Sequence, residues 1–147
     1  EEIVAEMAEG FLAAIPEAAK TKTAHPSTYK KIPGGGVLSI GVFHGQEYSR
    51  FVTMIGVIKA SLRMLGEAIK GITLMSADLE GMFNSFLVQK VPKNWEKVAY
   101  PCLKPLNSWV QDFIERLRFM MSWLTKGPPA SFWISSFFFP QGFMTAA

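Results

Sequence analysis

Two glycines, Gly36 and Gly41, have the separation of the glycine pair in a nucleotide-binding phosphate loop. In such a loop a lysine follows the second glycine and binds the phosphates, and a serine or threonine comes next. Here the following residues are Val42 and Phe43, so the cation that would bind phosphate is missing. Pro33 also stands where a strand would have to lead into the loop. We therefore interpret the glycine-rich stretch as a flexible turn and not as a nucleotide site.

The other residues suited to metal or acid–base chemistry are scattered. His25 and His44 lie far from each other and from Cys102, and no group of acids surrounds either histidine, which argues against a metal site. A single cysteine excludes an internal disulfide and fits a reducing compartment. Gln46 and Glu47 offer one carboxylate at the start of a helix, where a surface charge or a cap is the usual role. We expect no catalytic, cofactor-binding or metal-binding residue.

The composition is that of one folded domain. Of the 147 residues, 49% are hydrophobic and 13% aromatic, which is enough to bury a core and excludes a disordered tail. A small domain rarely buries so many rings, so we expect some of them to face a partner. The candidate packing or interface residues are Trp95, Trp109, Phe113, Trp123, Trp133, Phe137, Phe138, Phe139 and Phe143. We interpret the methionines as adaptable core residues, namely Met54, Met64, Met75, Met82, Met120, Met121 and Met144.

Charge and hydropathy disfavour further classes of protein. The net charge is +3, and the cations are interspersed with acids instead of forming a stripe, so no nucleic acid is expected as a partner. The most apolar stretch, 132–144, is too short to cross a membrane and is interrupted by polar residues and Pro140. Glu1 and Glu2 open the sequence without a basic region before an apolar one. We therefore expect no secretory signal, and we interpret the start as a cut inside a helix.

The longest periodic stretch, 46–70, predicts a helix. Its apolar residues follow at steps of four and three and form one stripe: Phe51, Ile55, Ile58, Leu62, Leu65 and Ile69. We expect the charged residues beside the stripe to lie in water, namely Glu47, Arg50, Lys59, Arg63, Glu67 and Lys70. The repeat is too short for a self-pairing coiled coil, which favours a core helix of a bundle. Gly71 is well placed to end this helix as a left-handed cap.

A second long helix is predicted over 105–125, where Pro105 suits the first position. Its stripe has the same steps: Leu106, Val110, Phe113, Leu117, Met120 and Leu124. We expect Trp109 and Phe113 to be largely buried. Asp112 and Arg116 are four residues apart with the acid first, a favourable arrangement that is worth roughly a few tenths of a kcal/mol when such a pair is exposed.

Two shorter helices are predicted earlier in the sequence and between the long ones. Residues 1–16 form an acidic amphipathic helix, and residues 76–88 form another with Ser76 as its cap. Between 17 and 41 the periodicity fails, which indicates a long loop. The basic residues of this loop are Lys20, Lys22, Lys30 and Lys31.

The last part of the sequence, 132–147, is an aromatic segment followed by the start of a helix at Pro140. Taken together, the helical periods and short connections predict an all-α fold, an antiparallel helical bundle formed by one segment, 1–147. We also expect Phe137, Phe138, Phe139, Phe143 and Met144 to need cover from further polypeptide; the alternative is that the aromatic run folds back under the helices. The isolated segment should therefore self-associate through them, and Phe138→Ser should weaken that association.

Several ordered runs carry a family resemblance from about residue 46 to the end. They are Val91–Trp95, Tyr100–Leu106 and Phe132–Thr145, together with Trp109, Asp112, Arg116 and Trp123. This pattern resembles the C-terminal region of dynein heavy chains, after the sixth AAA+ module, and is most similar to the axonemal branch. Small departures are Cys102 where the family often has serine and Ser136 where it often has glycine. The stretch Gly34–Gly45 is less polar than the family's usual approach to the long helix.

The resemblance implies a segment of a very large ATP-driven microtubule motor of the cytoplasm and cytoskeleton, found in the axoneme of a cilium or flagellum. In that family the C-terminal region packs against the AAA+ ring, and the ATP, magnesium and microtubule sites lie elsewhere in the motor polypeptide. A β-barrel-like part follows the helical part, and Ala147 falls before it. The segment would be a non-catalytic structural or regulatory part, with the ring and the remaining C-terminal domain as partners.

A second interpretation stays open at this point. The protein would be an independent helical protein–protein interaction module that binds a partner through its aromatic surface. The two interpretations differ in whether the source transcript continues well beyond both ends of the sequence.

Overall fold

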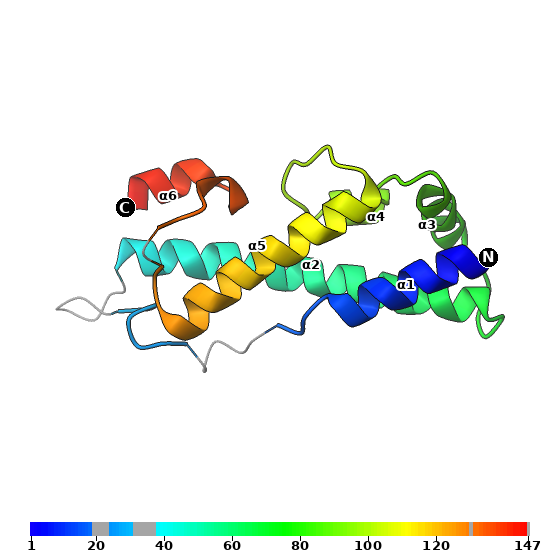
Figure 1. Ribbon diagram of the computed structural model, residues 1–147, viewed down its shortest axis with the longest axis horizontal. Helices are drawn as coiled ribbons and strands as arrows, with labels where there is room; N and C mark the ends of the chain where they lie inside the picture. Colours follow the sequence, from blue (N-terminus) through cyan, green and yellow to red (C-terminus); the bar gives the residue numbers. More distant parts are fainter. Residues whose placement is uncertain (19–23, 31–37, 130, 147) are drawn as a thin grey trace. The chain divides into compact units, whose positions relative to one another are not determined.

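The computed structural model describes residues 1–18, 24–30, 38–129 and 131–146. In sequence order the elements are α1 (Glu2–Ala14), α2 (Ser39–Ile69), α3 (Ala77–Leu87), α4 (Lys93–Glu96), α5 (Leu106–Lys126), the 3₁₀ turn η2 (Ile134–Ser136) and α6 (Pro140–Ala146) (Figure 1). Every regular element within those ranges is helical, which confirms the all-α prediction. Of the expected loop, Lys20, Lys22, Lys31 and Gly34–Gly36 lie outside the described residues.

The protein divides into two compact units, although the sequence indicates a single segment. Unit 1 consists of Glu1–Glu17 and Thr53–Ile114, and unit 2 consists of Ala18–Val52 and Glu115–Ala147. Each unit therefore combines two stretches that are distant in sequence, and α2 and α5 contribute residues to both. No helix in the described part of the protein is long and apolar enough to span a membrane.

Helix α2 begins at Ser39 instead of Gln46, so the loop expected over 17–41 ends earlier than predicted. The carbonyl of Leu38 accepts bonds from the amides of Gly41 and Val42, at 2.9 and 3.1 Å, which start the helix. Glycines in this stretch lower the intrinsic helix propensity. Burial of Phe43, which is 5% exposed, supplies packing energy that propensity alone does not reveal.

The end of α2 is formed as predicted. Gly71 has a φ of +80°, in the left-handed region. Its amide donates to the carbonyl of Ala68 at 3.1 Å, and the amide of Ile72 donates to Glu67 at 3.0 Å. These two bonds make a Schellman cap, which satisfies carbonyls that the last turn would leave without a partner.

The stripe of α2 is buried from Phe51 to Leu65 and half-buried at Ile69, and two of the charged residues expected in water are buried as well. Glu47 is 1% exposed and Lys59 is 5% exposed. Lys59 Nζ lies 2.8 Å from Glu17 Oε1, so the aliphatic stem is covered while the ammonium meets a carboxylate that is itself mostly in solvent. The expectation of hydrated side chains was wrong at both positions, because segments distant in sequence cover them.

Both ends of α3 are capped, each by a different kind of residue. Ser76 caps the start as predicted, with its Oγ accepting a bond from the amide of Leu79 at 3.3 Å. The far end closes through Gln89, whose φ of 58° is left-handed although it is not glycine. There Lys90 donates to the carbonyl of Ser85 at 2.9 Å.

Helix α5 buries its predicted stripe, and Trp109 and Phe113 are 1% and 0% exposed. Asp112 is 5% exposed, and it accepts a hydrogen bond from Lys104 Nζ at 3.1 Å. The extended segment before α5 brings that lysine over the first turns of the helix. The carboxylate of this salt bridge is therefore buried, and about half of the lysine side chain remains in solvent.

Candidate functional site

Aromatic rings form the interior of unit 2. The cluster consists of Phe43, Phe119, Trp123, Phe132, Phe137 and Phe143. The ring of Phe137 lies 4.9 Å from that of Phe43 and 5.1 Å from that of Phe143. Distances of this size between ring centres are typical of stabilising edge and tilted contacts.

This cluster changes the expectation for the carboxyl-terminal rings. Phe137 and Phe143 are 3% and 6% exposed, so the prediction that they need cover from further polypeptide was wrong. The 3₁₀ turn and α6 fold the aromatic run back onto Phe43, which a linear reading does not reveal. Phe139 and Met144 remain largely in solvent, with 51% and 67% of their surfaces exposed.

A separate aromatic cluster forms the core of unit 1. The rings of Trp95 and Trp109 lie 5.7 Å apart, and Phe113 stacks on Trp109 at 5.9 Å. Trp95 Nε1 donates a hydrogen bond of 2.8 Å to Ser61 Oγ, so its one polar group is satisfied inside the core. These residues act in packing.

Trp133 is a half-buried residue of unit 2. The guanidinium carbon of Arg116 lies 5.9 Å from the centre of its ring, within the range of a cation–π contact. Arg116 also donates to the carbonyl of Ser136 at 3.4 Å, at the end of the 3₁₀ turn. The arginine therefore fixes the segment that carries Trp133 against α5.

His44 is fully buried and both of its ring nitrogens have partners. Nε2 lies 3.0 Å from the carbonyl of Met120, and Nδ1 lies 2.9 Å from the hydroxyl of Tyr29. A carbonyl only accepts, so Nε2 carries the proton and Nδ1 accepts from the tyrosine. Burial lowers the pKa of His44 to about 4, against a smaller opposing effect of the Met120 bond. The histidine is a neutral structural link at physiological pH.

The segment 24–30 caps the end of α5. Thr28 Oγ1 donates to the carbonyls of Trp123 and Leu124, at 2.8 and 3.1 Å. The amide of His25 adds a bond of 2.7 Å to Leu124. Gly127 follows with a φ of +89°, and a side chain there would meet Ser27 Oγ and His25 Nδ1. The second histidine thus belongs to a helix cap, and no group of three or more potential ligands for a metal occurs among the described residues.

Glu47 joins α2 to the segment before α6. Its Oε1 accepts a hydrogen bond from the backbone amide of Phe138, and its Oε2 lies 3.4 Å from Arg50 Nη1. The Arg50 guanidinium also lies 5.9 Å from the centre of the Phe138 ring. Burial raises the pKa of Glu47 above its usual value, while the bonds to the backbone at Phe138 and Phe139 and the charge of Arg50 oppose that rise.

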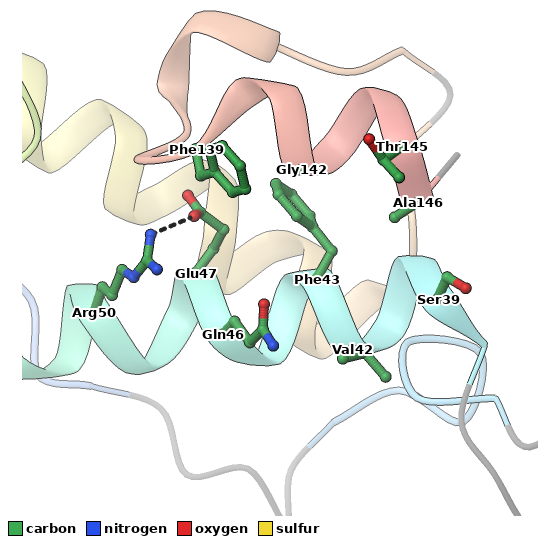
Figure 2. Close-up of a pocket in the computed structure, with 10 residues that line it drawn as sticks. All are labelled: Ser39, Val42, Phe43, Gln46, Glu47, Arg50, Phe139, Gly142, Thr145 and Ala146. Carbon is green, nitrogen blue, oxygen red and sulfur yellow. Dashed lines mark hydrogen bonds and ion pairs between the residues drawn. The ribbon is translucent and has the colours of Figure 1, made fainter.

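A groove of about 400 Å³ lies beside this carboxylate, and we call it the α2–α6 groove. It is lined by Ser39, Val42, Phe43, Gln46, Glu47 and Arg50 from α2, and by Phe139, Gly142, Thr145 and Ala146 (Figure 2). Phe43 and Phe139 point into the space between the two helices in Figure 2. Its lining combines apolar side chains with amide, hydroxyl, carboxylate and guanidinium groups, which suits the binding of an apolar side chain that has polar neighbours.

Glycine sets how closely α6 approaches α2 in this groove. A Cβ at Gly142 would meet the ring of Phe139 and would lie 3.3 Å from Cδ1 of Phe43. Val42, which is 46% exposed, and Phe139 provide accessible apolar surface at the edge of the groove. The most accessible of the candidate rings is therefore next to a concave surface.

The structure places the candidate aromatic residues in three environments. The buried ones are Trp95, Trp109, Phe113, Trp123, Phe137 and Phe143. Trp133 and Phe138 are half-buried, and Phe139 is exposed. The sequence analysis missed the polar partners Thr28, His44 and Glu47. A signal for two of them exists, because Glu47 and His44 continue the α2 stripe backwards from Phe51 by steps of four and three.

Comparison with known proteins extends the likeness to the whole sequence. Residues 1–147 match the family described as the C-terminal domain of the dynein heavy chain. Human dynein axonemal heavy chain 6 is 43% identical over 145 residues, which cover 99% of this sequence and 4% of that protein. Mouse dynein axonemal heavy chain 3 is 42% identical over 148 residues, again 99% of this sequence and 4% of the relative.

A third relative, mouse dynein axonemal heavy chain 12, is 48% identical over 102 residues, which cover 69% of this sequence and 3% of that protein. The protein thus spans only a small part of the length of these relatives. The match includes residues 1–45, which lack the motifs that carry the resemblance in the sequence. The protein belongs to the family of C-terminal domains of dynein heavy chains.

Proposed function

We propose that this protein is a non-catalytic structural or regulatory part of an axonemal dynein heavy chain and packs against the AAA+ ring of that motor. The observation that carries the proposal is the 43% identity to an axonemal relative across 99% of the sequence. In this proposal ATP, magnesium and microtubules are bound by other parts of the motor polypeptide. The parent motor works on the cytoskeleton, in the axoneme of a cilium or flagellum.

The proposal includes a finer description of the fold. The helices form an antiparallel bundle, and a β-barrel-like part completes the larger C-terminal domain. Support comes from the interior of each unit, where the ionisable side chains serve packing: His44 and Glu47 join segments of unit 2, and Lys59 binds Glu17 in unit 1. Groups used in this way stabilise a scaffold.

The test uses a full dynein heavy chain that ends in this domain. The double substitution Val42→Ser and Phe139→Ser removes accessible apolar surface from the α2–α6 groove, and we expect it to change microtubule gliding velocity. Leu103→Ser is the control, because Leu103 is also an exposed apolar residue but belongs to unit 1. Unchanged velocity in the double variant, or the same change in the control, would argue against regulation through this surface.

A second experiment addresses catalysis. Calorimetric titration of the 147-residue protein with ATP and magnesium should produce no binding heat, because the residues after Gly41 lack the phosphate-binding lysine. Micromolar binding that requires magnesium would contradict a non-catalytic role.

The accessible edge of the α2–α6 groove also suits the alternative, an independent helical interaction module. In that case the transcript would encode no AAA+ modules before Glu1. Sequencing the transcript distinguishes the two functions directly.

A further inference from the structure

Unit 1 contains a second groove, of about 530 Å³, between α2, α3 and α4. We call it the α3–α4 groove. Its apolar floor is formed by Leu79 and Met82, which are buried, and by Met64, which is 54% exposed. A volume of this size lies within the range of about 300–1,000 Å³ that is usual for binding pockets.

One wall of the α3–α4 groove is formed by small residues of α3. Ala77, Gly81 and Ser85 follow one another at steps of four on α3, so they lie along the same face of the helix. A Cβ added at Gly81 would meet no atom within 4 Å. The Ser85 hydroxyl bonds to the carbonyl of Gly81 in its own helix, at 3.0 Å. Because the distance between packed helices depends on the side chains at the contact, this wall allows close approach of another helix.

Exposed apolar residues also lie in the turn that leads to Ser76, a residue of the groove lining. The turn between α2 and α3 presents Ile72, Leu74 and Met75, which are 69%, 92% and 39% exposed. Exposed apolar residues that gather in one part of a surface are typical of interaction sites, and methionines such as Met64 adapt to different partners. The groove and the turn together form a surface suited to an apolar helix face.

The opposite wall carries positive charge. Lys93 and Lys97 are four residues apart, line the groove and are exposed. Neither forms an ion pair with another residue in the described ranges, whereas Lys59 and Lys104 do. Asp78 on α3 is the one acid among the residues that line this groove. The wall formed by α4 therefore complements acidic residues spaced by one helical turn.

We propose that the α3–α4 groove binds an acidic amphipathic helix of a second protein. The apolar face of that helix would lie on Met64 and Met82, close to Gly81, and carboxylates along one flank would meet Lys93 and Lys97. This interaction is separate from the proposed packing against the AAA+ ring and does not depend on it.

The test is fluorescence anisotropy of a labelled synthetic peptide with the 147-residue protein. The peptide has leucine and methionine at helical spacing and glutamates four residues apart on one flank. We expect saturable binding that weakens as salt is added, because the lysines are exposed. Lys93→Glu with Lys97→Glu should weaken binding by about tenfold or more. The matched control replaces two exposed lysines outside the groove, Lys70 and Lys90, by glutamate. It should bind the peptide as tightly as the parent protein does.

A second pair of variants separates binding from folding. Gly81→Leu places a large side chain where the partner helix would approach, so it should abolish binding. Leucine also has a higher helix propensity than glycine, so the melting temperature should not fall. Gly10→Leu makes the same exchange at an open position of α1 and should leave binding intact.

Three results would overturn the proposal. The first is equal binding by the double lysine variant and the parent, and the second is equal binding by a peptide whose glutamates are replaced by lysines. The third is sedimentation that shows the groove occupied by a second copy of this protein, with self-association lost in Gly81→Leu.

Discussion

The carboxylate of Glu47 accepts a hydrogen bond from the backbone amide of Phe138, 91 residues further along the sequence. This bond connects the first third of α2 to the segment that precedes α6, and Arg50 approaches the other carboxylate oxygen. The groove beside α6 therefore depends on a charged group that periodicity alone assigned to solvent. Several consequences are measurable.

Removing the Glu47 acceptor should destabilise the protein. In Glu47→Ala the half-buried amide of Phe138 loses its partner, and we expect a loss of about 1 kcal/mol in the free energy of unfolding. Glu47→Gln keeps an acceptor oxygen and should cost less. Urea denaturation monitored by circular dichroism measures both, and equal stability of the alanine variant and the parent would contradict the structural role.

The pH dependence of the Glu47 contribution follows from its raised pKa. A carboxyl whose pKa is higher in the folded than in the unfolded state contributes stability that is fully present below the unfolded pKa and is lost as pH rises through the folded pKa. We therefore expect the parent to lose stability relative to Glu47→Gln as pH rises above about 4.5, the usual value. Denaturation curves at a series of pH values measure this difference.

Glu17 should behave in the opposite way. Its hydrogen bond and charge interaction with Lys59 lower its pKa, so its contribution is present above the unfolded pKa and is lost as pH falls through the folded pKa. Because this carboxylate is exposed, the effect should be small and should shrink in salt. Glu17→Gln compared with the parent near pH 4 and pH 7 tests the sign. A difference that grows as the pH falls would contradict it.

The two buried tryptophans Trp95 and Trp123 should respond differently to replacement by phenylalanine. Trp95 Nε1 donates to Ser61, whereas no described residue accepts a hydrogen bond from Trp123 Nε1. Trp95→Phe therefore loses a buried bond and leaves a serine partner behind. We expect it to be more destabilising than Trp123→Phe by about 1 kcal/mol in thermal or urea unfolding. The reverse order would show that the Trp123 indole has a polar partner.

Backbone strain at Gln89 predicts a stabilising change. Its φ of 58° is unfavourable for a residue with a side chain, so Gln89→Gly should raise the free energy of unfolding by about 1 kcal/mol. Gly71 has the same kind of conformation, and Gly71→Ala should lower stability by a similar amount. Melting temperatures of the two variants should therefore move in opposite directions.

The sequence predicts the helices well because their stripes are local and regular. The stripe from Phe51 to Ile69 is one example, and the caps at Gly71 and Ser76 also depend on residue types close in sequence. The early start of α2 and the cover over Phe137 follow from packing against segments far along the sequence, which local propensity does not contain. Glu47 and His44 lie on the continued stripe, but their polarity favours the opposite interpretation until Phe138 and Met120 are seen to bind them.

The division of each unit into two stretches has a consequence for biosynthesis. All residues of unit 1 have been made once Ile114 is complete, whereas unit 2 needs Glu115–Ala147 as well. Until that last stretch leaves the ribosome, His44 lacks the carbonyl of Met120 and Glu47 lacks the amide of Phe138. We expect these two polar residues to be hydrated during that interval. They would therefore reduce the exposed apolar surface, and with it the tendency to aggregate, compared with a fully apolar stripe.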